Sequence, residues 1–142
     1  MMLRYLLDTN ILSDVIKNPS GSAANYMISL NKEMINTSII VASEMRYGIE
    51  KKNSLVLTER VNVLLQTIHV LPFDIDADRF YGKIRANLEQ QGKMIGANDL
   101  LIAAHALSIN AILVTDNIRE FQRIDGLIIE NWLEGQCHRS QK

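Results

Sequence analysis

Short apolar runs that alternate with helical patterns constrain the fold of this chain more than any other feature of its sequence. The runs at residues 5–7 and 112–114 are too short for buried helices, and longer segments between them repeat apolar residues at helical spacing. Parallel strands need a long crossover connection, which a helix supplies, so this alternation is typical of a parallel sheet. We therefore predict an α/β fold in which a short, mostly parallel sheet is covered by helices on both faces.

The individual elements can be placed along the chain from the same patterns. Strands are predicted near residues 4–7, 34–38, 69–73 and 111–115. Helices are predicted near residues 10–17, 22–31, 40–51, 55–67, 98–108 and from the acidic segment 74–78 to residue 91. We expect a loop at residues 91–97 and Asn98 as the N-cap of the helix that follows it.

Length and composition indicate one globular domain. Of 142 residues 47% are hydrophobic, and we assign the domain to residues 1–135 and a polar tail to residues 136–142. No apolar run approaches the roughly 18 residues that span a bilayer, and Asp8 interrupts any signal-peptide core. A single cysteine excludes an internal disulfide framework. We expect a cytoplasmic protein without a membrane partner, and the net charge of −1 gives no global indication of nucleic-acid binding.

Two of the apolar runs lead directly into acidic and polar residues. These residues are Asp8, Thr9 and Asn10 after the first run, and Thr115, Asp116 and Asn117 after the second. The carboxyl ends of parallel strands meet at one edge of a sheet, where open α/β sheets bind ligands. Asp8 and Asp116 are therefore expected together at this edge. A helix N-cap is the alternative role for Asp8, because Asp, Thr and Asn all cap helices well.

Two further acids are expected near the same edge. Asp99 lies in the first turn of the apolar helix at 98–108, and this helix precedes the strand that carries Asp116, so its first turn returns to that edge. Glu44 borders the inward apolar stripe of the helix at 40–51. A carboxylate there is costly unless it is paired, protonated or bound to metal. A simple capping acid is the alternative for Asp99, and a solvated position is the alternative for Glu44.

Four carboxylates at one edge favour a metal site. Like charges raise one another's pKa unless a cation lies among them, and oxygen-only ligands favour Mg²⁺ or Mn²⁺ over Zn²⁺. No histidine or cysteine cluster competes, since His69 begins a strand, Cys137 lies in the tail and His105 is expected in the core. Such an ion can activate water for in-line attack, so we predict phosphodiester hydrolysis.

Four motifs resemble those of a known family. The sequences LLDTNIL, ASEMRYG, IGANDLLIAAHAL and LVTDNIREF occur in the order and approximate spacing of PIN-domain ribonucleases, and residues 3–133 closely resemble the VapC toxins of bacterial toxin–antitoxin pairs. The resemblance implies a PIN-domain-like three-layer fold and a Mg²⁺-dependent endoribonuclease toxin of a type II system, in which Mn²⁺ is expected to substitute. The implied catalytic and metal-binding residues are Asp8, Glu44, Asp99 and Asp116, supported by Thr9, Asn10, Thr115 and Asn117. Many VapC toxins carry Asn where this chain has Asp116, which implies a weaker or indirect role for this residue.

The resemblance also implies partners. The expected substrate is structured RNA, often a tRNA, and Arg85, Lys93 and Arg119 are candidates for contact with its phosphates. A solvated helix face is the alternative, as for Arg85 with Glu89 four residues later. A cognate antitoxin and a homodimer are also expected. The apolar side chains proposed for these contacts, or else for the core, are Tyr26, Met27, Leu30, Leu57, Val61, Leu64 and Leu65.

Other protein classes place acids at strand ends. A receiver domain needs an adjacent acidic pair after its first strand, and a haloacid dehalogenase phosphatase needs an Asp two residues after Asp8, where this chain has Asn10. These Mg²⁺-dependent phosphotransfer and phosphatase folds therefore fit less well. A non-catalytic subunit that binds RNA or protein remains the other alternative, and it would not require all four acids.

Overall fold

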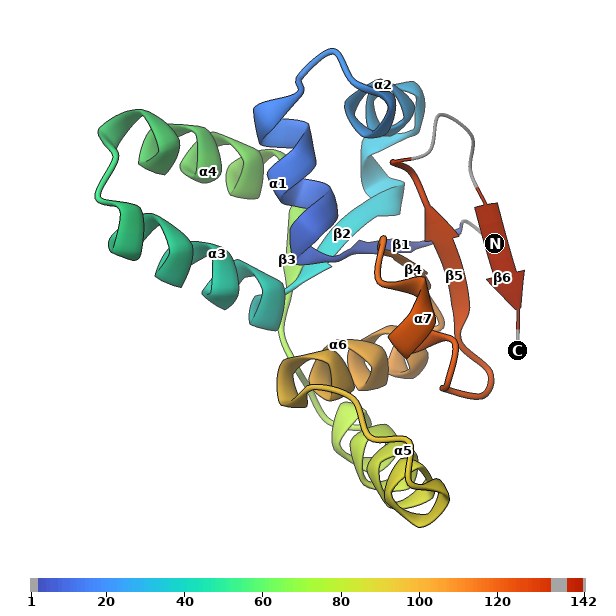
Figure 1. Ribbon diagram of the computed structural model, residues 1–142. Coiled ribbons are helices and arrows are strands. Elements are labelled where there is room, and N and C mark those ends of the chain that lie inside the picture. The colour runs from blue at the N-terminus through green and yellow to red at the C-terminus, as the bar shows by residue number, and fades with distance from the viewer. Residues whose placement is uncertain (1–2, 134–137, 142) are drawn as a thin grey trace.

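A six-stranded sheet forms the centre of the computed structural model, which describes residues 3–133 and 138–141. The strand order is β3-β2-β1-β4-β5-β6 (Figure 1). The strands are β1 (Tyr5–Leu7), β2 (Ile35–Ser38), β3 (His69–Leu71), β4 (Ile112–Val114), β5 (Ile128–Asn131) and β6 (His138–Gln141). Neighbouring strands from β3 to β5 are parallel, and β6 is antiparallel to β5. The predicted α/β fold with a mostly parallel sheet is confirmed.

Helices make the connections between the parallel strands. They are α1 (Thr9–Lys17), α2 (Ser22–Ser29), α3 (Ile39–Lys52), α4 (Leu55–Thr67), α5 (Ala77–Gln91), α6 (Ala97–Ser108) and α7 (Ile118–Phe121), with a 3-10 turn at Lys32–Met34 before β2. Pairs of helices join β1 to β2, β2 to β3 and β3 to β4, whereas the short α7 joins β4 to β5. Each crossover is thus long enough to return the chain to the same end of the sheet.

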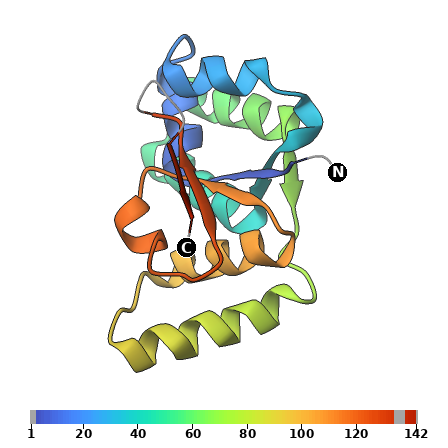
Figure 2. The same ribbon diagram turned by 90° about the vertical axis from the view of Figure 1, so that its right-hand side faces the viewer.

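The helices form layers on both sides of the sheet, as the sequence predicts. Figures 1 and 2 show α1, α2 and α4 on one side and the pair α5 and α6 on the other, with α6 next to the sheet. Helix α3 follows β2 and contacts both α1 and α6. Among the described residues, no helix is long and apolar enough to cross a bilayer.

The chain reverses its direction of travel across the sheet at β1 and β4. It proceeds from β1 outward through β2 to β3, and then returns to β4 on the other side of β1. Leu7 pairs with Thr37 of β2 and with Val114 of β4, and the Asp8 N–H donates to the Val114 carbonyl oxygen at 2.8 Å. Crevices at the carboxyl ends of strands at such a reversal are where open α/β sheets bind ligands.

Several features differ from the sequence predictions. Helix α7 and strands β5 and β6 are absent from the sequence predictions, and residues 138–141, which were assigned to a polar tail, pair with β5. Cys137 of that tail lies outside the described residues. The N-cap of α6 is Gly96 and not Asn98, because the helix begins at Ala97. Asp99 nevertheless lies in the first turn, as predicted.

The apolar residues expected at a subunit interface belong mostly to the core. Val61, Leu64 and Leu65 of α4 are buried, and the other four are partly buried against the core. The exposed apolar side chains of α4 are instead those of Leu55, Val56 and Val63. Helical spacing located the buried stripe correctly, and the exposed residues lie on the opposite face of the same helix.

Candidate active site at the carboxyl ends of β1 and β4

Asp8 is the most buried acid of the candidate site, and both of its carboxylate oxygens are held. It follows β1 directly and is the N-cap of α1. The Thr9 N–H donates to Oδ1 at 2.8 Å, and the Thr115 hydroxyl donates to Oδ2 at 2.8 Å. Because Thr115 follows β4, this second bond joins the ends of the two strands at the reversal. Asp8 thus caps a helix and also lies at the crevice.

Glu44 is connected to Asp8 through Thr9. The Thr9 hydroxyl donates to Glu44 Oε1 at 2.8 Å, while the N–H of the same residue holds Asp8. Glu44 lies on α3, where the neighbouring Val41 and Met45 are buried in the core. The half-buried Glu44 side chain is therefore fixed by helix packing and turned toward the start of α1.

Asp99 is linked to a fifth acid, Glu120, by the amide of Asn117. The Asn117 side-chain nitrogen lies 3.3 Å from Asp99 Oδ2 and 2.8 Å from Glu120 Oε2. The backbone N–H of Asn117 also donates to the Thr115 hydroxyl oxygen at 3.0 Å. A continuous series of hydrogen bonds therefore connects Asp8, Thr115, Asn117 and Asp99.

Asp116 lies at the exposed rim of this arrangement. The Asn10 side-chain amide donates to Asp116 Oδ1 at 3.0 Å, in a solvent-accessible position. Each of the four support residues predicted from the sequence thus hydrogen-bonds to one of the four predicted acids. Asp116 is thus exposed, whereas Asp8 is buried.

The electrostatic properties of the site follow from burial and from repulsion among the acids. Burial raises the pKa of Asp8, and repulsion by Glu44 and Asp116 adds to the rise, although hydrogen bonds from Thr115 and Thr9 oppose it. Burial, a hydrogen bond with Glu120 and repulsion by Asp8, Glu120 and Glu44 raise the pKa of Asp99 to about 7. Bonds from Asn117 and Asp99 lower the pKa of Glu120. Asp99 therefore keeps its proton to a higher pH than an ordinary aspartate, and the protonated form can donate a hydrogen bond to the Glu120 carboxylate.

The side chains at this site carry the oxygen ligands that a hard divalent cation prefers. They are carboxylates at one end of the sheet, and their mutual repulsion is what a cation would relieve. Their spacing is not that of a closed site: within residues 3–133, no group of three or more Asp, Glu, His or Cys side chains is arranged to hold a metal ion. The acids instead engage Thr and Asn side chains, so ion binding requires carboxylate rotation.

Glu120 is the functional candidate that sequence reasoning missed. It lies three residues after Asn117, in the spacing of a capping box, and within the motif LVTDNIREF. This spacing could have indicated the short helix α7, which carries Glu120 back toward Asp99. His105, by contrast, is a core residue as predicted: its Nδ1 lies 2.7 Å from the Ser38 hydroxyl, and burial lowers its pKa.

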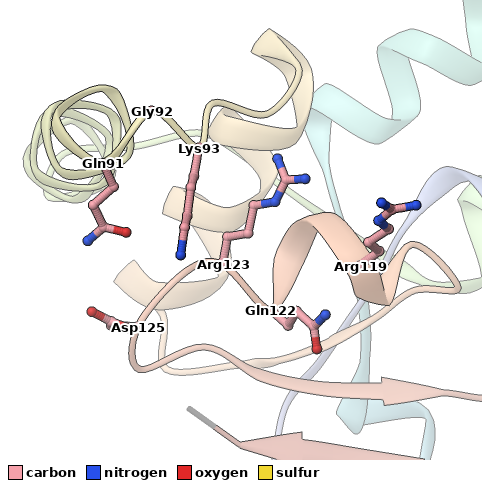
Figure 3. A pocket seen from close by; sticks show the side chains of 7 residues that line it. All are labelled: Gln91, Gly92, Lys93, Arg119, Gln122, Arg123 and Asp125. Carbon is pink, nitrogen blue, oxygen red and sulfur yellow. The ribbon is translucent and has the colours of Figure 1, made fainter.

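Two of the three cations predicted to contact RNA line one hollow, whose lining includes Asp125 but none of the four predicted acids. Lys93 and Arg119 line, with Arg123, a hollow of about 500 Å³, and its other lining residues are Gln91, Gly92, Gln122 and Asp125. Figure 3 shows these side chains, with the Arg119 guanidinium directed away from Lys93. Arg85 does not line this hollow. Its guanidinium engages Glu89 at 3.3 Å and the Tyr81 hydroxyl at 2.9 Å on its own helix.

A second, more apolar groove begins at Glu44. It has a volume of about 180 Å³ and runs between α1, α3 and α4, and its apolar lining includes Ile16, Met45, Ile49, Leu57 and Val61. Thr9 and Glu44 lie in the lining of the same groove. The groove therefore joins an apolar surface to the acidic site.

Comparison with known proteins relates this arrangement to one family. The PIN domain family matches residues 5–127. Ribonuclease VapC2 of Rickettsia felis is 41% identical over 130 residues, which cover 90% of this chain and 97% of the relative. The tRNA(fMet)-specific endonuclease VapC of Shigella flexneri is 38% identical, covering 92% of this chain and 99% of the relative.

Solved structures give the same relationship. VapBC2 from Rickettsia felis, crystallised with a DNA fragment from its promoter, contains a chain with a TM-score of 0.85 and 40% identity, covering 92% of this chain and 99% of that one. DNA-bound VapBC from Salmonella typhimurium contains a chain with a TM-score of 0.82 and 37% identity, with the same coverage. The three-layer arrangement is thus that of the toxin chains in these complexes.

Substitution of Asp99 tests the electrostatic description of the metal-free site. Because the folded-state pKa of Asp99 lies above its unfolded value near 3.9, the folded protein binds more protons between these values, and stability falls as pH rises from about 4 to about 7. Asp99→Asn removes the unfavourable charge. In chelator at about pH 8, its urea midpoint should therefore exceed that of the wild type, and the gain should shrink at about pH 5. Asp78→Asn, an exposed change on α5, is the control. A midpoint for Asp99→Asn at or below the wild-type value at the higher pH would contradict the description.

Proposed function

The chain belongs to the PIN-domain family, among its VapC ribonucleases, and from this relationship we propose that it is a Mg²⁺-dependent endoribonuclease and the toxin of a type II toxin–antitoxin pair. The observation that carries the proposal is the hydrogen-bonded series from Asp8 through Thr115 and Asn117 to Asp99, at the reversal point of the sheet. A mere fold scaffold has no need to gather repelling acids at this position.

Asp8, Glu44 and Asp99 are the residues proposed to hold the metal ion, with Glu120 beside Asp99 and Asp116 at the rim. A carboxylate offers about four lone-pair positions, so the single hydrogen bond at Glu44 leaves positions for an ion. When bound, a divalent ion lowers the pKa of water and neutralises charge that develops on a phosphodiester. Mn²⁺ is expected to substitute, because it accepts the same oxygen ligands.

The chain's own residues orient these ligands and control one proton. Thr115 and Thr9 fix the plane of the Asp8 carboxylate, and Thr9 also holds Glu44. Asp99 must lose its proton before it can bind a cation, and the neighbouring Glu120 carboxylate already accepts a hydrogen bond from it. The Asn117 amide contacts the carboxylates of Asp99 and Glu120 and so keeps the two side chains next to each other when Asp99 loses its proton.

The proposed substrate is structured RNA, and tRNA is the first candidate because curated relatives are named tRNA(fMet)-specific endonucleases. Loops of structured RNA offer unstacked nucleotides and an accessible backbone. Lys93 and Arg119 are proposed to contact RNA phosphates, since both side chains line a hollow at the surface. Arg85 is a weaker candidate, because its guanidinium is already engaged by Glu89 and Tyr81.

Cleavage assays with acid-to-amide variants test the proposed enzyme. Wild-type protein with Mg²⁺ should cleave RNA from a total tRNA preparation, and excess EDTA should abolish this. Asp8→Asn and Asp99→Asn should lose at least about a hundredfold in rate, as when one transition-state contact is removed, whereas Asp116→Asn should lose less. The control Asp78→Asn should cleave at the wild-type rate, and circular dichroism should show all variants folded. Robust cleavage in EDTA, or wild-type cleavage by Asp8→Asn, would contradict the mechanism. The second result would favour a non-catalytic binding subunit.

The groove that begins at Glu44 supports the proposed antitoxin partner. An amphipathic segment can place apolar side chains against Met45, Ile49 and Leu57 and carry a cation to the acids. Arginine suits this role, since its guanidinium pairs with carboxylates through two parallel hydrogen bonds and is always charged. An arginine at Asp8 and Glu44 would compete with the metal ion, so the partner would inhibit cleavage by occupying the site.

Expression in the native genetic context tests the toxin assignment. Expression of the chain alone should arrest growth and cleave cellular RNA, and co-expression with the adjacent small open reading frame should restore growth. The Asp8→Asn variant should be harmless in both cases, which shows that arrest follows from cleavage. Equal growth with and without the partner, together with intact RNA and folded protein, would refute the toxin assignment.

A homodimer is proposed through the exposed face of α4. Leu55, Val56 and Val63 expose large apolar side chains on this helix, and the Leu55 side chain is 87% exposed. Burial of such a surface against a second copy would remove it from water. The opposite face of α4 is already occupied by the core, so it is not available for this contact.

Light scattering at micromolar concentration tests the dimer. The wild type should have a mass twice that of the 16.1 kDa chain. Val63→Glu should be monomeric, because it places a charge in the apolar contact, while Gln90→Glu on exposed α5 should remain dimeric. A monomeric wild type, or an unaffected Val63→Glu, would exclude this interface.

A further inference from the structure

We propose that the basic hollow lined by Lys93, Arg119 and Arg123 is a subsite for a backbone phosphate of the RNA strand, outside the scissile bond. This inference rests on the proposed ribonuclease function and adds the position of the strand. The hollow is lined by three cations, two Gln amides and one carboxylate, that of Asp125. Its volume of about 500 Å³ can admit a phosphate with its sugar. Clustered Lys and Arg side chains with neutral hydrogen-bonding partners are the usual contacts of nucleic-acid backbone.

The cations reach the hollow from two separate segments. Figure 3 shows Lys93 extending from the loop after α5, and Arg119 and Arg123 from α7 and the turn that follows it. Among the described residues, the Lys93 side chain has no hydrogen bond or ion pair, so its ammonium group is available to a ligand. The two segments together form a cation-lined gap that neither forms alone.

The frame of the hollow is held in place by backbone interactions. Gly92 ends α5 with φ of +68°, a conformation that favours glycine, and the Lys93 N–H donates to the Leu88 carbonyl oxygen at 2.9 Å. The Arg123 guanidinium donates to the Met94 carbonyl oxygen at 3.0 Å and so ties the loop to the segment after α7. A ligand therefore meets cations whose backbone is already ordered, which reduces the entropy lost on binding.

Glu120 connects the hollow to the proposed catalytic acids. It lies between Arg119 and Arg123 in sequence. The Asn117 amide bridges Glu120 and Asp99. Glu120 is thus adjacent in sequence to one cation of the hollow and linked through Asn117 to Asp99, and the inference places a strand held in the hollow next to the proposed metal site. The acids repel phosphate, and the cations beside them supply the compensating attraction.

Salt dependence of RNA binding tests the subsite. Binding of a fluorescein-labelled single-stranded RNA of about 12 nucleotides is measured by anisotropy in chelator, where the RNA stays intact, at several NaCl concentrations. Each phosphate contact contributes about −0.7 to the slope of log K against log salt for single strands. Lys93→Gln, Arg119→Gln and Arg123→Gln should each reduce the steepness of that slope by about 0.7 and weaken binding up to about fivefold. The Lys93→Gln/Arg123→Gln double variant should reduce it by about 1.4.

Matched variants separate a phosphate contact from a structural effect. Arg60→Gln removes one exposed charge from α4, away from the hollow, and should leave the slope unchanged. Arg123→Gln also removes the bond to Met94, whereas Lys93→Gln removes no bond that the described residues make, so the latter isolates the charge. With Mg²⁺, Lys93→Gln should raise KM for RNA and leave kcat close to the wild-type value.

The outcomes distinguish this inference from the proposed function. Unchanged slopes in all three single variants, with wild-type cleavage, would overturn the subsite and leave the ribonuclease in place. Reduced slopes in a protein that never cleaves RNA would support the subsite and refute the nuclease. Unchanged RNA binding with weakened antitoxin binding would assign the hollow to the protein partner and so overturn the inference.

Discussion

The hydrogen bond from the Thr115 hydroxyl to the Asp8 carboxylate is the interaction on which the rest of the site depends. It spans the carboxyl ends of β4 and β1, the two strands between which the chain reverses its course. Thr9 donates to Asp8 and also to Glu44. Asn117 donates to Thr115 and also to Asp99, so both acids are held through this one bond. Helices α1, α3 and α6, which carry Thr9, Glu44 and Asp99, are therefore all connected by hydrogen bonds to the ends of β1 and β4. Two short strands can in this way position the side chains of a reaction centre.

The acids that are proposed to bind the ion also make the folded protein less stable when no ion is bound. Asp8 is almost fully buried, and within residues 3–133 no Lys or Arg forms an ion pair with any of the four predicted acids. The apolar sheet and the Thr and Asn hydrogen bonds hold these charges together against their repulsion. A site of this kind is unfavourable by itself and becomes favourable on cation binding, so residues that weaken the empty protein strengthen its complex with a ligand.

The sequence predicted the parts of this structure that local patterns encode. Asp8 and Asp116 follow apolar runs, and Asp99 lies in a first turn, so their common edge could be inferred from topology alone. The role of Glu120 could not be predicted, because α7 has only one turn and no apolar periodicity. Strand β6 could not be predicted either, because its residues are polar and form a strand only by pairing with β5. The N-cap of α6 is Gly96, whereas the sequence predicted Asn98. The exposed apolar residues of α4 lie opposite the buried stripe that the sequence predicted. These features arise from tertiary packing, which sequence periodicity does not encode.

The two edges of the sheet are formed by short strands, β3 and β6, with a consequence for self-association. On one side β6, of four residues, forms the edge, and by pairing with β5 it makes that parallel strand an interior one. The opposite edge, β3, has three residues and is followed directly by Pro72, which has no N–H to donate. An intermolecular ladder started there would end almost at once. The parallel strands β2, β1, β4 and β5 therefore lie inside the sheet, where their backbone groups cannot serve as a template for fibrous polymerisation.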